Sequence, residues 1–466
     1  MVHTTRRTLL ALSILARILG SAGWPDRAFA QAGPDIVRPA PITDLGTGQV
    51  YYVDQSNPSA TDTGPGSASL PWRTLLHAVK TARAGETVLI RRGTYNDAES
   101  GRVSVANSGT AGHPITFAAF PGDERQVVIT GATFRIAGKS YVVVRGLKVT
   151  GVTNTSSPRG FSIEGPGADI TLSGNETYDT YSSGIGVWGV PWSADPTDYQ
   201  HLFNIVLENN LVRRACDGGY DECITVANGV NNIVVRNNEV TESGNTANGG
   251  EGIYFKEGVF GGRVEGNFVH DIVKVAIYMD AGGVGIGPGG VESIDIAGNR
   301  VRNITNGGGI ELGDEGRGNL KNLRALNNVV DGVSGNALLV YAHPSGSGTA
   351  SGIALLNNTV YGNRSYGVRI NWPSTRASGI LACNNLGYLN AYGDWSVASG
   401  SSAAADHNLW GIDPLFVDPV TGDLRLRAGS PAVDTGSATG APAVDFAGVA
   451  RPQGAGFDIG AFERQP

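Results

Sequence analysis

The sequence predicts an all-β fold, a right-handed parallel β-helix with an N-terminal capping helix. A short phrase recurs along the chain at spacings of 27 to 35 residues, and each repeat contains strand-like alternation of apolar residues. Glycine accounts for 68 of the 466 residues, and only 17% of the residues are charged. Repeat periods of about 20–50 residues are typical of solenoids. The absence of helical periodicity within the repeats indicates that the coils are built from strands.

Each repeat is marked by an Asn-Asn or Gly-Asn pair in phrases such as IVLENNLV and IVVRNNEV. The second position of these pairs and of one related phrase falls at Leu147, Asn175, Asn210, Asn238, Asn267, Asn299, Asn328, Asn358 and Asn385. Stacked coils place equivalent residues over one another at about 4.8 Å. We therefore expect these asparagines to hydrogen-bond from coil to coil. We interpret the column as structural, and expect Cys383 in the same phrase to be a core residue.

A second phrase follows each pair and alternates between apolar and variable residues, as a strand with one buried face does. Its inward positions are Ile185, Ile224, Ile253, Ile277, Ile310, Leu338 and Val368. The outward column one residue later holds Gly186, Thr225, Tyr254, Tyr278, Glu311, Leu339 and Arg369. The outward column three residues later holds Trp188, Ala227, Lys256, Asp280, Gly313, Tyr341 and Asn371.

The two ends of the chain differ from the repeats. Apolar residues recur at helical spacing from Trp72 to Ala82, which predicts a helix that closes the open end of the solenoid. The predicted segments are an export signal at 1–30, a cap with the first coils at 31–140, coils with the candidate site at 141–390, and a Gly/Pro/Asp-rich module at 391–466. We expect this last module to lie along or over the last coils.

The first 30 residues have the pattern of an export signal. Arg6 and Arg7 precede an apolar run, and Ala28-Phe29-Ala30 supplies a small-x-small cleavage site. Paired arginines favour the twin-arginine route, so we expect a secreted or periplasmic protein. The apolar run is too short to span a membrane, and no later segment reaches the required length.

The net charge of the chain restricts the kinds of molecule that it can bind. Loss of the signal removes four arginines and one aspartate, so the net charge moves from −7 to about −10. Binding to nucleic acid depends on neutralising phosphates, and an acidic protein is unsuited to it. We expect a monomer whose long side accepts an extended ligand.

Three cysteines are present, and two of them, Cys216 and Cys223, flank a short acidic loop. A disulfide between this pair is expected in an oxidising compartment, with two buried thiols as the alternative. No Cys/His spacing indicates a zinc site.

Both ends of the chain carry a resemblance to a known family. The opening YYVD…PWRTLLHAV…AGETVLIRRGTY resembles the N-terminal cap of polysaccharide lyases of the pectate-lyase-like superfamily. The closing DPLF…LRLRAGSPAVDTG…RPQGAGFDIGAFE resembles the module called choice-of-anchor Q. With the coils, the resemblance covers nearly all of the mature chain. It implies the architecture and leaves open whether the protein is a lyase, a hydrolase, an epimerase or non-catalytic.

The outward columns suggest where chemistry takes place. Elimination at a uronic acid needs a base at the α-carbon and positive charge on the carboxylate. Lys256 is one of few lysines, and the alignment places it beside Asp280, so elimination by Lys256, Asp280 and Glu311 is the leading hypothesis. Tyrosine rings are natural platforms for sugar faces. The predicted substrate-binding residues are Tyr254, Tyr278, Tyr341, His343, Arg369 and Asn371.

A calcium ion is a further expectation, since lyases of this superfamily often hold one on nearby carboxylates. Its predicted ligands are Glu251, Glu257 and Asp314, with Asp280 and Glu311 as additional oxygen donors. One alternative is a glycoside hydrolase, because Asp280 and Glu311 are offset by one coil and two residues, about 8 Å, which suits an inverting pair. The other alternative is a non-catalytic protein that binds a polysaccharide at the cell surface.

Overall fold

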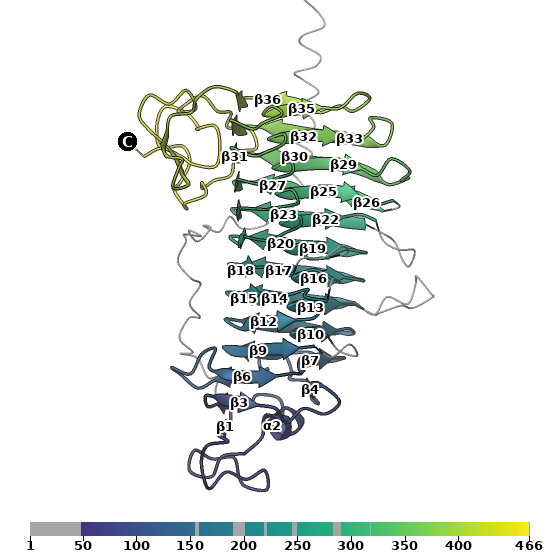
Figure 1. The fold of residues 1–466 in the computed structure, drawn as a ribbon, viewed down its shortest axis with the longest axis vertical. Coiled ribbons are helices and arrows are strands. Elements are labelled where there is room, and N and C mark those ends of the chain that lie inside the picture. Colours follow the sequence, from purple (N-terminus) through teal and green to yellow (C-terminus); the bar gives the residue numbers. More distant parts are fainter. Residues whose placement is uncertain are drawn as a thin grey trace, which may run out of the picture. The chain divides into compact units, whose positions relative to one another are not determined.

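The structure, a computed structural model, describes residues 48–153, 158–189, 201–218, 221–244, 249–282, 290–316 and 318–465. The predicted export signal at 1–30 lies outside these residues. The chain divides into two compact units, one at Asp35–Phe255 and the other including Lys256–Pro466. Each unit is a stack of coils with three parallel sheets, here called sheets A, B and C (Figure 1). The predicted right-handed parallel β-helix is confirmed.

In the unit Asp35–Phe255, each complete coil after the helix contributes one strand to each of the three sheets. Sheet A contains β1 (Val50–Val53), β2 (Thr87–Ile90), β5 (Ile115–Ala119), β8 (Val142–Arg145), β11 (Gly167–Ser173), β14 (Leu202–Glu208) and β17 (Val230–Arg236). Sheet B contains β3 (Gly93–Tyr95), β6 (Val127–Thr130), β9 (Leu147–Val152), β12 (Glu176–Thr180), β15 (Leu211–Arg213) and β18 (Glu239–Thr241). Sheet C contains β4 (Arg102–Ser104), β7 (Thr133–Ala137), β10 (Phe161–Glu164), β13 (Ile185–Trp188) and β16 (Ile224–Ala227). The strand β19 (Ile253–Lys256) ends one residue into the second unit.

The unit that includes Lys256–Pro466 continues the same pattern. Sheet A contains β20 (Val259–Glu265), β23 (Gly290–Ala297), β26 (Asn319–Lys321), β27 (Arg324–Leu326), β30 (Thr349–Leu356), β33 (Ala377–Cys383) and β36 (Ala404–Asp406). Sheet B contains β21 (Phe268–His270), β24 (Arg300–Arg302), β28 (Val329–Asp331), β31 (Thr359–Tyr361), β34 (Leu386–Tyr388) and β37 (Leu409–Trp410). Sheet C contains β22 (Ile277–Asp280), β25 (Ile310–Asp314), β29 (Leu338–Ala342), β32 (Val368–Asn371) and β35 (Trp395–Val397). An antiparallel hairpin, β38 (Phe416–Asp418) and β39 (Asp423–Leu426), follows the coils.

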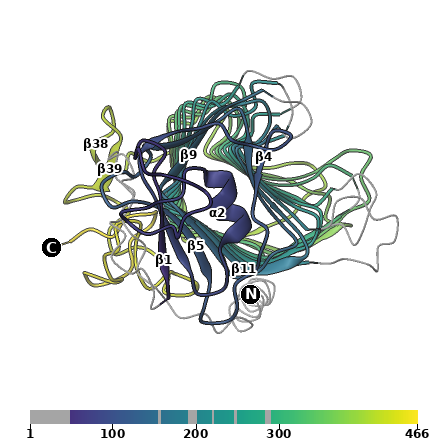
Figure 2. The same cartoon turned by 90° about the horizontal axis from the view of Figure 1, so that it is seen from below.

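The predicted capping helix is α2 (Leu75–Thr81). Thr74 caps it by accepting a hydrogen bond from the backbone N–H of His77. The helix buries Leu75, Ala78 and Val79, and Figure 2 shows it across the inside of the first coils, viewed along the stack. A helix in this position covers the apolar side chains at the open end of the stack, which in the middle of the stack are buried by a neighbouring coil.

The asparagine column hydrogen-bonds from coil to coil, as the sequence predicts. In the second unit the chain of contacts runs through Asn267, Asn299, Asn328, Asn358 and Asn385, each almost fully buried. From Asn299 to Asn385, each side-chain oxygen accepts from the backbone N–H and the side-chain amide of the preceding asparagine, and each amide also donates to a backbone carbonyl. The column therefore satisfies polar groups that are shielded from water, which accounts for its repetition in the sequence.

The residue before each column asparagine has a left-handed backbone. Asn327, Asn357 and Asn384 have φ of 53°, 51° and 56°, a region that asparagine and glycine tolerate best. Their side-chain amides donate to backbone carbonyls of the C-terminal segment, at Val444, Asp458 and Ser437 respectively. The doubled asparagine thus has two roles in these coils. The second residue holds the coils together, and the first binds the C-terminal segment.

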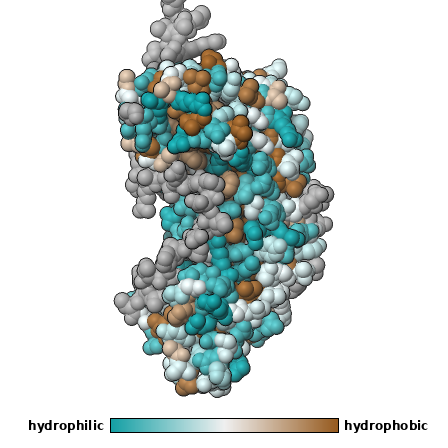
Figure 3. All heavy atoms as spheres, turned by 60° about the vertical axis from the view of Figure 1, so that its left-hand side comes forward, coloured by the Kyte–Doolittle hydropathy of each residue, from teal (hydrophilic) through white to brown (hydrophobic). Residues whose placement is uncertain are grey.

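The C-terminal segment packs on coils of its own unit through an apolar cluster. Phe416, Leu424, Phe446 and Ile459 contact Val329 and other buried residues of sheet B. Arg451 and Glu463 form an ion pair of 2.8 Å whose side chains are fully buried. Arg451 also donates to the backbone carbonyls of Asp458 and Gly460, so its charge is compensated by several acceptors. The surface of this part of the unit mixes small hydrophobic and hydrophilic patches (Figure 3).

Candidate functional site

Sheet C of the second unit presents the columns that the sequence predicts. Ile277, Ile310, Leu338 and Val368 pair in register and are buried. The first outward column aligns Tyr278 with Glu311, Leu339 and Arg369, and the second aligns Asp280 with Gly313, Tyr341 and Asn371. Alternation along a strand fixes which side chains leave the coil on this side. The predicted register is therefore confirmed for these strands.

Two tyrosines from different coils meet on this side. The rings of Tyr278 and Tyr341 are stacked with centroids 6.3 Å apart, and their hydroxyls are hydrogen-bonded to each other. The Tyr278 hydroxyl also donates to Glu315 Oε1 at 3.2 Å. Burial raises the pKa of the Tyr341 hydroxyl, and the negative charges of Glu311, Glu315 and Asp280 raise it further. Tyr341 consequently keeps its proton over a wide pH range.

The ring of Tyr341 occupies the space above Gly313. A Cβ at residue 313 would lie 2.3 Å from Cε1 of Tyr341 and 2.7 Å from its Cζ, and all three of the nearest atoms belong to this ring. The ring can therefore lean across the intervening strand β25 towards Tyr278 only because that strand has glycine there.

We expect Gly313→Ala to displace the Tyr341 ring and to lower the free energy of unfolding by about 1–3 kcal/mol, the usual cost of inserting a methyl group into a filled space. Denaturant unfolding measures this change. The control is the double variant Gly313→Ala/Tyr341→Ala, in which the clash is absent. An equal cost in wild type and in the Tyr341→Ala background would contradict this explanation.

The tyrosines are not the exposed platforms that the sequence suggests. Only 4% of Tyr278 and 5% of Tyr254 is exposed. Outward direction on the strand did not ensure exposure for Tyr278, because Tyr341 and Glu315 contact it from other coils. Tyr341 is half-buried, so of these three rings it is the one that solvent reaches most.

Asp280 and Asp314 are buried at the ends of β22 and β25. Asp280 Oδ1 accepts from the backbone N–H groups of Gly282 and Glu315 at 2.7 and 3.2 Å. Asp314 accepts from the N–H groups of Gly316 and Gly348, at 2.6 and 3.1 Å. Both carboxylates therefore hold the loops that follow the strands. This placement differs from the predicted solvent-facing roles, catalytic for Asp280 and metal-binding for Asp314.

Lys256, Glu257 and Glu251 are half-buried. Lys256 is the last residue of β19, and Glu257 follows it with a left-handed φ of 60° at the start of a turn. Glu311 is half-buried, and its carboxylate lies over Gly308. Within the described ranges, no three or more His, Cys, Asp or Glu side chains form a group suited to a metal ion. The predicted calcium ligands are thus not gathered into one cluster there.

The remaining predicted binding residues lie further along the second unit. Arg369 stacks over the ring of Tyr366 at 4.8 Å, and Asn371 is exposed at the end of β32. His343 is exposed in the loop after β29, and its Nδ1 contacts the Ser345 hydroxyl at 2.9 Å. These three side chains are arranged along the same sheet as Tyr341, but the contacts that hold them are local.

Cys216 and Cys223 are free and buried in the structure, so the predicted disulfide is not formed in it. The two thiols interact through a side-chain hydrogen bond, and burial raises the pKa of Cys216 well above that of an ordinary thiol, with Cys223 contributing further. The structure thus has the alternative of two buried thiols, held close to each other. Cys383 is buried, as predicted for a core residue.

Sequence reasoning missed a second polar group on sheet C of the first unit. The guanidinium of Arg159 lies 4.8 Å from the ring of Trp188 and 3.4 Å from Asp221. Asp221 also accepts a hydrogen bond from Ser182. Trp188 stood in an outward column of the repeat, but Arg159 and Ser182 come from loops, whose positions no repeat spacing predicts.

Comparisons with known proteins agree with the fold. Residues 51–200 match the family model described as "Pel9A-like, right handed beta helix region". The protein is 32% identical over 143 residues to "Uncharacterized protein YwoF" of Bacillus subtilis (strain 168), a match that spans 28% of this chain and 29% of that protein. The chain therefore aligns with less than a third of this relative.

Two solved structures superimpose on most of the chain. Pectate lyase Pel9A has a TM-score of 0.56 at 17% identity, covering 91% of this chain and 98% of the other. XylC in complex with xylose has a TM-score of 0.51 at 11% identity, covering 90% and 99%. At these identities the likeness concerns the fold. In the described part of the chain, none of the helices combines the length and the apolar character needed to cross a bilayer.

Proposed function

We propose that the protein is an exported carbohydrate-active enzyme, a polysaccharide lyase that cleaves a uronic-acid-containing polysaccharide by elimination on sheet C of the second unit. The observation that carries this proposal is the hydrogen-bonded pair Tyr278–Tyr341 beside Glu311 and Glu315, in which the half-buried phenol of Tyr341 retains its proton. Elimination needs such a proton donor for the departing oxygen. The match to a Pel9A-like family model makes elimination the reaction to test first.

The proposed chemistry divides the roles among this chain's residues. Lys256 removes the proton from the carbon next to the uronate carboxylate. A double bond then forms between this carbon and its neighbour, and the bond from that neighbour to the glycosidic oxygen breaks. Tyr341 gives its proton to the departing oxygen, and Tyr278 turns its own O–H from Glu315 to the phenolate that forms on Tyr341. Asp280 positions the loop at Gly282 and Glu315.

Calcium is part of the proposal only as an ion shared with the substrate. Glu311 and Glu315 supply two carboxylates on this side, and the substrate carboxylate would be a third oxygen donor. Such an ion would supply positive charge where two protein carboxylates would otherwise repel a uronate.

Hydrolysis by Asp280 and Glu311 is less well supported, because Asp280 is 1% exposed and engaged by two backbone N–H groups. An acid or base that attacks a substrate must reach it. Non-catalytic binding of a polysaccharide predicts no product at all.

The test is to incubate the purified protein with uronate and neutral polysaccharides, with calcium and with a chelator, while following ultraviolet absorbance of unsaturated products and new reducing ends. We expect both signals on a polyuronate, and a loss of rate with the chelator. Reducing ends without absorbance would indicate a hydrolase. Binding without either signal on every polymer would indicate the non-catalytic alternative.

A further inference from the structure

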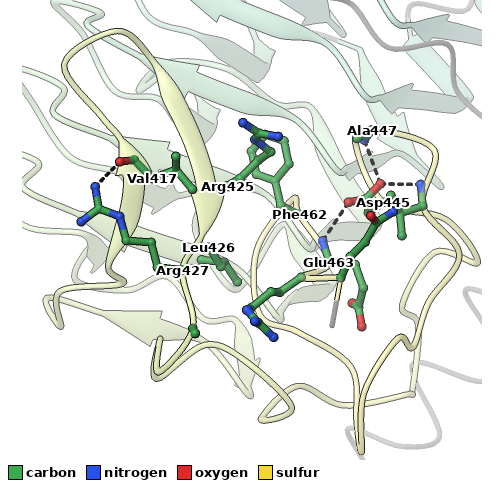
Figure 4. A pocket seen from close by; sticks show the side chains of 12 residues that line it. Val417, Arg425, Leu426, Arg427, Asp445, Ala447, Phe462 and Glu463 are labelled. Atoms are coloured by element: carbon green, nitrogen blue, oxygen red, sulfur yellow. Dashed lines mark hydrogen bonds between the residues drawn. The ribbon is translucent and has the colours of Figure 1, made fainter.

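A pocket lies in the C-terminal segment of the second unit, away from sheet C. Its volume is about 630 Å3, within the range of small-molecule sites of about 300–1,000 Å3. The hairpin β38–β39 forms one wall with Val417, Leu426 and Arg427, and the segment containing Asp445 and Phe462 forms the other (Figure 4).

The two acidic residues of the lining are occupied by donors from the protein. Asp445 accepts three backbone N–H groups, from Ala447, Val449 and Glu463, at 2.7 to 2.8 Å. Glu463 accepts from Arg451 and from the N–H groups of Gln453 and Asp458. Asp445 and Glu463 are 1% and 5% exposed, so their oxygens are engaged within the protein and are little accessible to a ligand in the pocket.

The three basic residues of the lining, by contrast, retain guanidinium N–H groups that can donate hydrogen bonds to a ligand. Arg425 is exposed and holds Asp423 through Nε and Nη2. Arg427 is exposed and donates through Nη2 to the carbonyl of Val417. The side chain of Arg464 is half-buried, and none of the described residues forms an ion pair with it or with Arg427. Positive charge therefore dominates the accessible lining.

The lining also includes apolar surface. Phe462 and Val417 are half-buried, and both contribute to the pocket. A flat ring next to guanidinium groups suits a ligand that has both a carboxylate and an apolar ring face. A simple inorganic anion would use the arginines and leave the ring without a function.

We propose that this pocket binds the carboxylate and ring of an acidic sugar, as a second carbohydrate site separate from sheet C. Arg427 and Arg464 hold the carboxylate, and Phe462 contacts the sugar ring. The choice of sugar rests on the proposed function, because a polyuronate would supply such units. A site of this kind would keep the enzyme on its polymer between cleavage events, since a second contact raises the effective concentration of the first.

The test is arginine footprinting of the full chain with phenylglyoxal, read by mass spectrometry. D-galacturonate is the probe, because it has no glycosidic bond to cleave. D-galactose is its neutral match, and inorganic phosphate is the simple anion. We expect D-galacturonate to slow modification of Arg427 and Arg464 severalfold, and the exposed Arg364 of the same unit to be unaffected.

A variant locates the binding. Arg425 also lines the pocket, so bound D-galacturonate is expected to shield it as well. In Arg427→Ala/Arg464→Ala this protection of Arg425 is expected to disappear, whereas Arg364→Ala leaves it unchanged. Equal protection by D-galactose or by phosphate, or no protection by any probe, would overturn the proposal. Protection of the arginines without cleavage of any polymer would contradict the proposed lyase activity and would still support this binding site. Cleavage of a polyuronate without protection of the arginines would support the lyase and contradict this binding site.

Discussion

Replacing Lys256 by alanine is expected to lower the rate of elimination by about 10²–10⁴-fold, the usual contribution of a positioned acid or base. Lys256 ends β19 and is half-buried. In the repeat alignment it occupies the same outward column as Asp280, Gly313 and Tyr341, whose register the structure confirms. The measurement is the initial rate of absorbance increase on a polyuronate, together with the unfolding midpoint of the variant.

Two further variants separate a base from a fixed charge. Lys256→Arg keeps the positive charge but replaces the amine by a guanidinium that does not lose its proton in proteins. We expect it to be nearly as inactive as Lys256→Ala. Lys321→Ala is the matched control, because Lys321 is exposed in the same unit and pairs with Glu292 at 2.7 Å. Full activity of Lys256→Arg would mean that Lys256 contributes charge alone.

The second large effect is expected from the asparagine column. Asn328→Ala removes the oxygen that accepts from the backbone N–H and the amide of Asn299, both at 3.0 Å. It also removes the amide that donates to Ile296 and Asn358. Each buried group left without a partner costs about 1–3 kcal/mol, so the variant is expected to be strongly destabilised or to fail to fold.

Denaturant unfolding of Asn328→Ala beside Asn306→Ala measures this effect. Asn306 is exposed in the same unit, and its backbone N–H, which the substitution retains, donates to Val273. We expect a change within about 0.5 kcal/mol for this control, as for ordinary surface substitutions. A similar small change for Asn328→Ala would contradict the structural role of the column.

The fold was predictable because its information is periodic. Equivalent residues of successive coils meet the same neighbours, so the spacing of Asn299, Asn328 and Asn358 alone predicts their hydrogen bonds. The alternation around Ile277 and Ile310 likewise predicts the register of sheet C. The short helix α2 followed from apolar spacing between two strand-like segments.

The candidate site was less predictable, because its details depend on loops. The alternation of the strand predicted that Tyr278 and Asp280 point out of the coil. It could not show that Tyr341 and Glu315 cover Tyr278. Nor could it show that the N–H groups of Gly282 and Glu315 engage Asp280. Loop contacts have no period from which they could be derived.

The most direct test of the proposed elimination is to digest a polyuronate in oxygen-18 water and to examine the products by mass spectrometry. Elimination adds no water to the broken bond. With wild-type protein we therefore predict products with unsaturated ends and no heavy oxygen at the cleaved bond. With Lys256→Ala we predict few or no such products. Saturated products that carry one heavy oxygen per cleavage would contradict the account, since only hydrolysis adds water to the broken bond.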